Sequence, residues 1–361
     1  MLRKTGQCFL IASRRQYTYT RMIIVKVAMS EHLPLSLQTT YRDLLDRHMR
    51  RPTPEIEGSI AVVENKGGRY WVARRRIGSR IVETRIGPDS DEIREKAEGL
   101  RLQNETLRTW ARDAGRLVAQ LRAARMPTPT PGTGKLINAL ARAGLFRSGC
   151  VLAGTHAYGL YALELGMQPK DELAKTEDVD VAAPRAVRVI TGDRESLTTS
   201  LEGVGLRPIA GPDDAHPVRW ETEDGVVLDV LTPRRRGGAS TVRHDGLGIW
   251  AQAVAFLDFS LVDPIDAVVL YREGIPVSIP SPERFAVHKL IVASARKGTH
   301  RAKSEKDLAQ AAWLIASLAE ARPFELAEAL KDARSRGPKW RFAIDASLAR
   351  RPDIGEVLVA L

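Results

Sequence analysis

The sequence predicts an α/β (α+β) protein in which a mixed sheet is flanked by helices. Three observations lead to this prediction. Three short runs rich in β-branched and aromatic residues come first, strands and helices then alternate, and helical periodicity fills the end of the chain. We therefore expect a basic amino-terminal α+β domain, a central sheet domain and a helical carboxy-terminal region.

The composition is that of a globular protein with a basic surface. The 361 residues are enough for two domains, and 43% hydrophobic with 27% charged residues is a globular balance. The net charge of +11 favours polyanionic partners such as nucleic acid or nucleotides, although an arginine-rich proteome would produce the same excess. No apolar run approaches the ~20 residues that a membrane span needs. Two distant cysteines, Cys8 and Cys150, exclude a disulfide framework and fit a cytoplasmic location.

The first 28 residues are basic and differ in character from the rest of the chain. They contain no acidic residue, as in a transit peptide, but Met29-Ser30-Glu31 reads as a second start. We expect residues 1–28 to be a disordered leader or a misassigned start.

The amino-terminal domain, residues 29–126, is predicted to hold a helix, a small β-meander and a long helix. The first helix covers residues 35–49. The runs 58–63, 69–76 and 80–86 are separated by glycine-containing turns, which predicts three antiparallel strands. Residues 90–125 have the apolar spacing of an amphipathic helix. A proline-rich linker, residues 127–133, ends the domain because proline removes backbone donors.

The central domain, residues 134–280, alternates helices and strands. Expected helices cover residues 135–143, 156–165 and 194–202, and expected strands cover 150–153, 179–182, 267–271 and 276–279. Residues 217–221 and 226–231 are predicted to form a hairpin around Glu223-Asp224-Gly225. The carboxy-terminal region, residues 281–361, is expected to be helical, with helices at 282–295, 303–320 and 323–334.

Three aspartates carry the strongest chemical signal. Asp178 and Asp180 point to one face of a strand because side chains alternate, whereas Val179 points to the other. Two carboxylates on one face repel each other unless a cation lies between them, and Mg²⁺ prefers such oxygens. Asp229 lies in an apolar strand, where an unpaired charge is costly. Each acid alone could instead cap a helix or pair with an arginine.

Together the three acids predict a two-metal site. Carboxylates on adjacent strands can hold two Mg²⁺ ions about 4 Å apart, with Mn²⁺ as an alternative ion, and such ions assist attack on an α-phosphorus. If Asp229 lay more than about 8 Å from the other two, a shared site would be excluded.

Gly154-Thr155 is the predicted phosphate turn. A strand that runs into Gly-Thr and then a helix presents backbone N–H groups and the positive helix end to an anion. Glycine allows close approach of the backbone, and the Thr155 hydroxyl can donate to a phosphate oxygen. The dipeptide is informative only because it comes one strand–helix unit before Asp178.

The order of these motifs resembles the nucleotidyltransferase (DNA polymerase beta-like) superfamily, including its minimal and abortive-infection-type members. The resemblance rests on Leu152-Ala153-Gly154-Thr155, on Asp178-Val179-Asp180 and on Asp229, and covers residues 134–318. Thr155 departs from the usual Ser or Gly. The resemblance implies a nucleotidyltransferase-fold sheet and a role in toxin or phage-defence systems.

The resemblance extends to Lys289 and to Lys306-Asp307-Leu308. It implies that Lys289 reaches the triphosphate, and an exposed lysine on an amphipathic helix is the alternative. Lys306 and Asp307 are expected to form a salt-bridged helix face. His156 and His288 lie on predicted helices, and His156 is the better functional candidate because it comes directly after the phosphate turn.

Two basic segments are candidate nucleic-acid contacts. Arginines interleave with aromatic residues in the predicted meander, a composition suited to phosphate contact and base stacking, and the candidates there are Arg69, Tyr70, Trp71, Arg74 and Arg75. This stretch also resembles hairpins of some transposase-associated proteins, and a packing hairpin with a charged outer face is the alternative. Arg234 and Arg235 come just after the Asp229 strand and are expected beside the acidic centre, with a solvated loop as the alternative.

Residues 131–136 are similar to a P-loop only superficially. No strand precedes them, and Leu136 stands where Ser or Thr would bind the metal.

The sequence thus predicts a Mg²⁺-dependent enzyme that transfers a nucleotidyl group from an NTP to a hydroxyl on RNA, protein or a small molecule. One alternative is a nucleic-acid-binding regulator on a catalytically decayed scaffold, and another is a nuclease that uses the same acids.

Overall fold

The computed structural model describes residues 31–65, 67–77, 80–168, 173–174, 178–185, 205–209, 216–244, 247–296, 298 and 301–361. The predicted leader, residues 1–28, and the predicted helix at 194–202 lie outside the described residues. In the described part, no helix combines the length and the apolarity that crossing a membrane requires.

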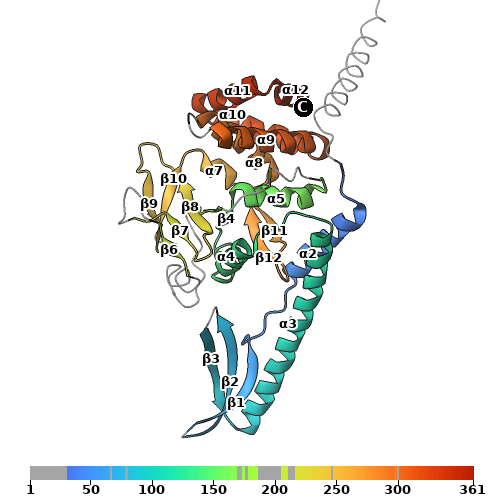
Figure 1. The fold of residues 1–361 in the computed structure, drawn as a ribbon, viewed down its shortest axis with the longest axis vertical. Coiled ribbons are helices and arrows are strands. Elements are labelled where there is room, and N and C mark those ends of the chain that lie inside the picture. The colour runs from blue at the N-terminus through green and yellow to red at the C-terminus, as the bar shows by residue number, and fades with distance from the viewer. Residues whose placement is uncertain are drawn as a thin grey trace, which may run out of the picture.

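The amino-terminal part consists of a helix, a three-stranded sheet and a long helix, as predicted. Its elements are α2 (Leu35–Met49), β1 (Ser59–Asn65), β2 (Gly68–Ile77), β3 (Arg80–Pro88) and α3 (Asp91–Ala123). The strands form an antiparallel sheet in the order β1-β2-β3. The Ser90 hydroxyl accepts a hydrogen bond from the Ile93 backbone N–H at 3.3 Å and so caps α3. This sheet and the first half of α3 project from the rest of the molecule (Figure 1).

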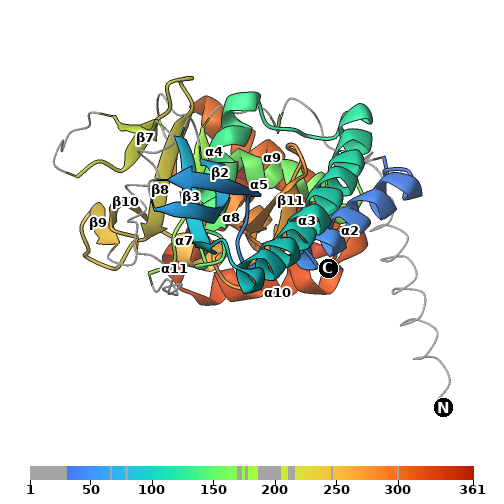
Figure 2. The ribbon, with the colours of Figure 1, turned by 90° about the horizontal axis from the view of Figure 1, so that it is seen from below.

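The second half of α3 and all of α2 belong to the main body. Tyr41 of α2 and Trp110 of α3 are buried in one hydrophobic cluster with Leu163 and Val268, which lie in the central part of the chain. The Tyr41 hydroxyl also accepts a hydrogen bond from the Val268 backbone N–H at 3.3 Å. Figure 2 shows α2 and α3 side by side on the flank opposite β7–β10. The amino-terminal helices are therefore part of the core that supports the central sheet.

Helix α4 (Pro131–Arg142) begins four residues earlier than predicted, inside the proline-rich segment. Thr130 is its N-cap and accepts a hydrogen bond from the Thr133 backbone N–H at 3.2 Å. Pro131 occupies the first helical position, where the missing N–H has no cost. The proline that suggested a linker thus starts the helix.

The central sheet is mixed and has seven strands in the described part of the chain. They are β4 (Val151–Leu152), β5 (Val179–Ala182), β6 (Arg207–Pro208), β7 (Arg219–Glu221), β8 (Val227–Pro233), β9 (Thr241–His244) and β10 (Ile249–Val254). The main order is β4-β5-β8-β10-β9; β7 pairs with the amino-terminal half of β8, and β6 pairs with β7. Strands β5, β8 and β10 are parallel neighbours, whereas the other pairs are antiparallel. The predicted hairpin of residues 217–221 and 226–231 is confirmed as β7 and β8, but β6, β9 and β10 were not predicted.

Helices cover the central sheet and complete the chain. Helix α5 (Gly154–Leu165) comes after β4, and α7 (Leu257–Ser260) comes after β10. The two strands predicted at 267–271 and 276–279 are β11 (Ile265–Val269) and β12 (Ile275–Ile279), and they form a separate antiparallel ladder. The helical carboxy-terminal region is confirmed as α8 (Pro282–Ala295), α9 (Arg301–Ala321), α10 (Pro323–Ser335), α11 (Pro338–Arg350) and α12 (Pro352–Val359). Four of these five helices begin with proline, which favours a defined helix start.

Candidate active site

The turn between β4 and α5 requires glycine at position 154. Gly154 has φ +62°, in the left-handed region that disfavours other residues. A side chain there would also overlap the Oδ2 atom of Asp180. The Ala153 backbone N–H donates to the Asp180 backbone carbonyl at 2.8 Å, which holds the turn against β5. The positive amino-terminal end of α5 therefore lies directly beside an aspartate.

Asp180 and Asp229 lie side by side on the central sheet. They are direct partners in the parallel pairing of β5 with β8. Neighbouring strands are about 4.8 Å apart and paired residues point to the same face, so the two carboxylates are well within the ~8 Å limit for a shared metal site. The alternating residues Val179 and Leu228 are buried on the opposite face. Asp178 precedes β5 by one residue and lies two positions from Asp180. Because side chains alternate along an extended chain, the two aspartates belong to the same face of the sheet.

The surroundings of Asp180 disfavour its charged form. The pKa of Asp180 is raised to about 6, first by burial and then by the nearby charges of Asp229 and Asp178, whereas Lys289 and Arg296 act in the opposite direction. Burial of an unpaired carboxylate and the approach of like charges are both costly. The site therefore accumulates negative charge that a cation would relieve.

Arg219 is a site residue that the sequence analysis missed. It is the cross-strand partner of Asp229 in the antiparallel pairing of β7 with β8. Its Nε donates to Asp229 Oδ1 at 2.6 Å, although the arginine side chain is 48% exposed. The sequence did contain a signal for this pair, since positions 219 and 229 are equidistant from Asp224 at the centre of the hairpin turn.

The acidic side chains are not arranged as a ready metal cage. Among the residues that the structure describes, no group of three His, Cys, Asp or Glu side chains is gathered closely enough to hold a metal ion. In addition, the Arg219 guanidinium lies against Asp229. A metal ion shared by all three acids would have to replace that contact.

Lys289 is part of a buried ion pair rather than an exposed helix face. Only 9% of Lys289 is exposed, and its Nζ donates to Asp307 Oδ1 at 2.7 Å. Arg296 contacts the other Asp307 oxygen at 3.0 Å. The predicted alternative of an exposed lysine is wrong, because α8 and α9 pack face to face. Asp307 is salt-bridged, as predicted, but it is buried and its partners include Lys289 and Arg296. Asp307 holds two cations close enough to Asp180 to affect its pKa.

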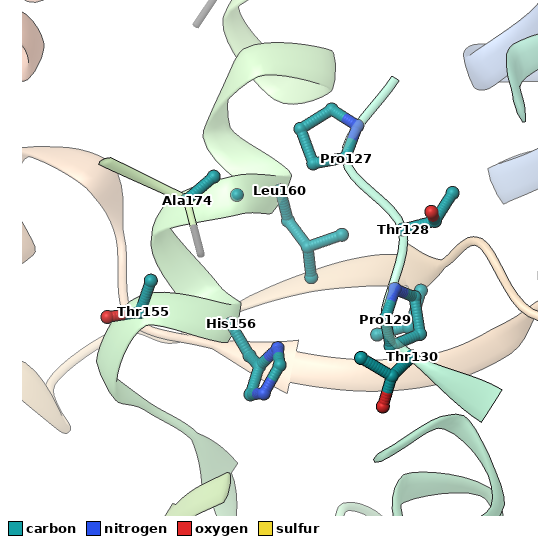
Figure 3. A pocket seen from close by; sticks show the side chains of 10 residues that line it. Pro127, Thr128, Pro129, Thr130, Thr155, His156, Leu160 and Ala174 are labelled. Carbon is teal, nitrogen blue, oxygen red and sulfur yellow. The ribbon is translucent and has the colours of Figure 1, made fainter. Parts of the chain in front are cut away.

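Thr155 and His156 come directly after Gly154 and line a cavity beside the first turns of α5 (Figure 3). The pKa of His156 is lowered to about 4, first by burial and then by the charge of Lys306, whereas Asp178 acts in the opposite direction. His156 is therefore neutral at pH 7. His288 is partly buried, and burial is the main cause that lowers its pKa to about 3.

The three candidate arginines of the amino-terminal sheet are engaged in ion pairs. Arg74 contacts Glu83 at 2.7 Å and Arg75 contacts Glu57 at 3.2 Å. Arg69 lies 3.8 Å from Asp89 and 3.6 Å from Glu64. These contacts fit the alternative of a packing hairpin with a charged outer face.

The two aromatic candidates differ in exposure. Trp71 is buried, and its indole N–H donates to Asp89 at 3.0 Å, so its ring is covered rather than presented for base stacking. The Tyr70 ring is stacked by Arg85, whose guanidinium carbon lies 3.8 Å from the ring centre.

Arg234 and Arg235 lie away from the acidic centre. Arg234 comes after the carboxy-terminal end of β8, whereas Asp229 is near its start. Five strand residues span about 16 Å, so the expected position beside the acids is wrong. The strand carries the basic loop to the opposite end of the sheet, and both side chains are exposed there.

Comparison with known proteins points to one family. A family model described as nucleotidyltransferase matches residues 132–335, which is more than half of the chain. The crystal structure of an antigenic nucleotidyltransferase-like protein from Paracoccidioides brasiliensis is similar, with 16% sequence identity and a TM-score of 0.39; the match covers 65% of this chain and 95% of that one. No curated protein sequence matches significantly.

Proposed function

The chain belongs to this nucleotidyltransferase family, and we propose that it transfers a nucleotidyl group from a nucleoside triphosphate to a hydroxyl acceptor with the help of Mg²⁺. The observation that carries the proposal is the pairing of Asp180 with Asp229 beside the Gly154 turn. In the reaction, the acceptor oxygen bonds to the α-phosphorus, the bond to the bridging β-phosphate oxygen breaks, and pyrophosphate leaves.

The residues present fit a hard divalent cation. The donors are carboxylate oxygens, which Mg²⁺ prefers, and the raised pKa of Asp180 reflects burial and like-charge repulsion that a cation would remove. Asp178, Asp180 and Asp229 would hold the ion once Arg219 released Asp229. The bound ion would neutralise charge on the reacting phosphates and lower the pKa of the acceptor hydroxyl.

The protein's own groups would bind and orient the nucleotide. The first turn of α5 offers backbone N–H groups to the phosphates, and Gly154 lets them approach closely. The Thr155 hydroxyl can donate to a phosphate oxygen. The carboxyl of Asp180 has to be ionised to act as a ligand, which its pKa of about 6 permits at neutral pH and above.

In this scheme Arg219 can pair either with Asp229 or with a phosphate of the nucleotide. Its guanidinium neutralises Asp229 in the metal-free protein, and its exposed side chain could turn to a phosphate of the bound nucleotide. The acceptor is left open between RNA, protein and a small molecule, and a role in defence systems is supported only by the resemblance of the motifs.

The experiment is a label-transfer assay. The full chain is incubated with each of the four NTPs labelled at the α-phosphate, with Mg²⁺, and with total cellular RNA or protein. We expect transfer of label that disappears in Asp178→Ala and Asp229→Ala. The matched control is Asp224→Ala, because Asp224 is an exposed acid in the same hairpin whose partner is the exposed Lys135.

Two outcomes would contradict the proposal. Cleaved strands without pyrophosphate release would indicate a nuclease. Binding of nucleic acid with no transfer from any NTP would favour a regulator on a decayed scaffold.

A further inference from the structure

A cavity of about 480 Å³ lies beside the first two turns of α5. One wall is the segment 127–130, which leads into α4, and the opposite wall is formed by Thr155, His156 and Leu160 of α5 (Figure 3). Val269 of β11 and Ala174 complete the lining. A volume of this size is within the range of small-molecule sites.

The cavity begins where the phosphate turn ends. Thr155 and His156 come directly after Gly154, which packs against Asp180. His156 also lies near enough to Asp178 for the charge of this aspartate to affect the pKa of the imidazole. From Thr155 to Leu160 the helix rises about 7.5 Å, so the cavity extends from the acids by roughly the reach of a ribose and base.

The lining suits a flat, uncharged ring. Pro127, Pro129, Leu160 and Val269 are apolar, and the two prolines hold their wall in a fixed backbone conformation. Among the described residues, no charged side chain lines the cavity, which disfavours a second phosphate group there.

His156 supplies the polar contact that such a ring needs. Its ring lines the cavity, and its Nε2 has no hydrogen-bond partner among the described residues. Because Nε2 has almost no accessible surface, a small turn of the ring is needed to bring it to a ligand in the cavity. A neutral imidazole has one N–H donor and one lone pair, so it can pair with the edge of a heterocycle. A buried polar atom without a partner is unfavourable, and a ligand that supplied the partner would bind more tightly for that reason.

We propose that this cavity holds the nucleoside part of the bound NTP, with His156 Nε2 hydrogen-bonded to the base or ribose. The inference rests on the proposed function and adds the place where the nucleoside is recognised. The phosphates lie at Gly154-Thr155, and the base enters between α5 and the segment 127–130. His156 is thus a specificity residue, distinct from the three acids.

The test compares binding of each NTP with binding of inorganic triphosphate, which lacks a nucleoside. Titration calorimetry on the full chain with Ca²⁺ avoids turnover. We expect at least one NTP to bind about tenfold or more tightly than inorganic triphosphate. His156→Phe and Thr128→Trp should remove that advantage and leave inorganic triphosphate unaffected, whereas His156→Gln should keep part of it because an amide can still pair.

Controls separate a filled cavity from a damaged fold. Thr128 is exposed, so tryptophan can be placed there without disturbing the core, and Thr106→Trp at an exposed position on α3 is the matched control. Thermal unfolding of each variant reports its fold. Equal binding of NTP and inorganic triphosphate by the native protein would overturn the inference, as would native NTP affinity in folded Thr128→Trp.

The two proposals fail in distinguishable ways. Label transfer with an unchanged KM for NTP in Thr128→Trp and His156→Phe would overturn the nucleoside pocket alone. Selective NTP binding that these variants abolish, without any label transfer, would overturn only the catalytic proposal.

Discussion

The amino-terminal sheet and the acidic end of the central sheet use charge in opposite ways. In the amino-terminal sheet, candidate arginines form exposed ion pairs with acidic residues, such as Arg74 with Glu83. At the central sheet, Asp180 and Asp229 are adjacent, Asp178 is close, and Arg219 pairs with only one of them. Exposed pairs stabilise a fold by little, whereas gathered like charges cost stability. A segment rich in charged residues is therefore weaker evidence for a functional site than several charges of one sign that the fold brings close together.

The largest expected effect is on the rate of label transfer, which should depend on the acidic centre and not on the amino-terminal sheet. Asp180→Asn should lower the rate of label transfer by at least about a thousandfold, because ion-mediated charge stabilisation contributes several kcal/mol to such reactions. The double variant Arg74→Ala/Arg75→Ala should stay within about threefold. Label transfer under identical conditions is the measurement. A comparable loss in the arginine variant would mean that the amino-terminal sheet contacts the acceptor.

The second prediction compares a buried pair with an exposed one. Asp307→Ala should lower the free energy of unfolding by about 3–5 kcal/mol, because it leaves the buried Lys289 without its partner. Glu83→Ala, which breaks the exposed pair with Arg74, should cost less than about 1 kcal/mol. Urea unfolding measures both.

A double variant tests the cause of this loss. Lys289→Met/Asp307→Leu should recover much of the stability, since the two buried charges are then gone and the partly exposed Arg296 can turn to solvent. Failure to recover would indicate that Asp307 acts through packing rather than through charge.

The third prediction concerns the stability cost of the acidic centre. The pKa of Asp180 is about 6 in the folded protein, above its ordinary value of 3.8, so the folded state keeps a proton that the unfolded chain has lost. Stability of the metal-free protein should therefore fall as the pH rises from about 4 to about 6. Asp180→Asn should stabilise it at pH 8 by on the order of 3 kcal/mol.

The stabilisation by Asp180→Asn should be absent at pH 4, and Asp224→Asn should have no effect at either pH. Urea unfolding with a chelator present is the measurement. If Asp180→Asn lowered the free energy of unfolding at pH 8, the ionised Asp180 carboxyl would not be destabilising in the folded protein.

The smallest effect concerns Arg219. Arg219→Ala should raise Mg²⁺ affinity by up to about fivefold, because an exposed ion pair contributes up to about 1 kcal/mol and the ion has to displace it. Titration of Mg²⁺ into the metal-free protein measures this. Arg207→Ala on the neighbouring β6 is the control, since its pair with Glu223 is highly exposed. Weaker Mg²⁺ binding in Arg219→Ala would mean that the arginine orients Asp229 for the ion.

Local patterns in the sequence were enough to predict most elements and to single out the three acids as candidates. Helices α2 and α8 have the predicted bounds because their apolar spacing and end residues are local signals. The alternation of Asp178, Val179 and Asp180 identifies a strand with carboxylates on one face for the same reason. The strands β9 and β10 were missed, as their short runs contain charged and polar residues such as Arg243 and Gln252.

The tertiary structure decided which residues meet. Pairing of β5 with β8 brings Asp229 beside Asp180, and pairing of β7 with β8 places Arg219 on Asp229, because register between strands depends on packing across the whole sheet. The packing of α8 on α9 buries Lys289 with Asp307. The position of the segment 127–130 against α5 creates the cavity at His156. The sequence by itself predicted the kind of chemistry, and long-range contacts determined the partners of each charge.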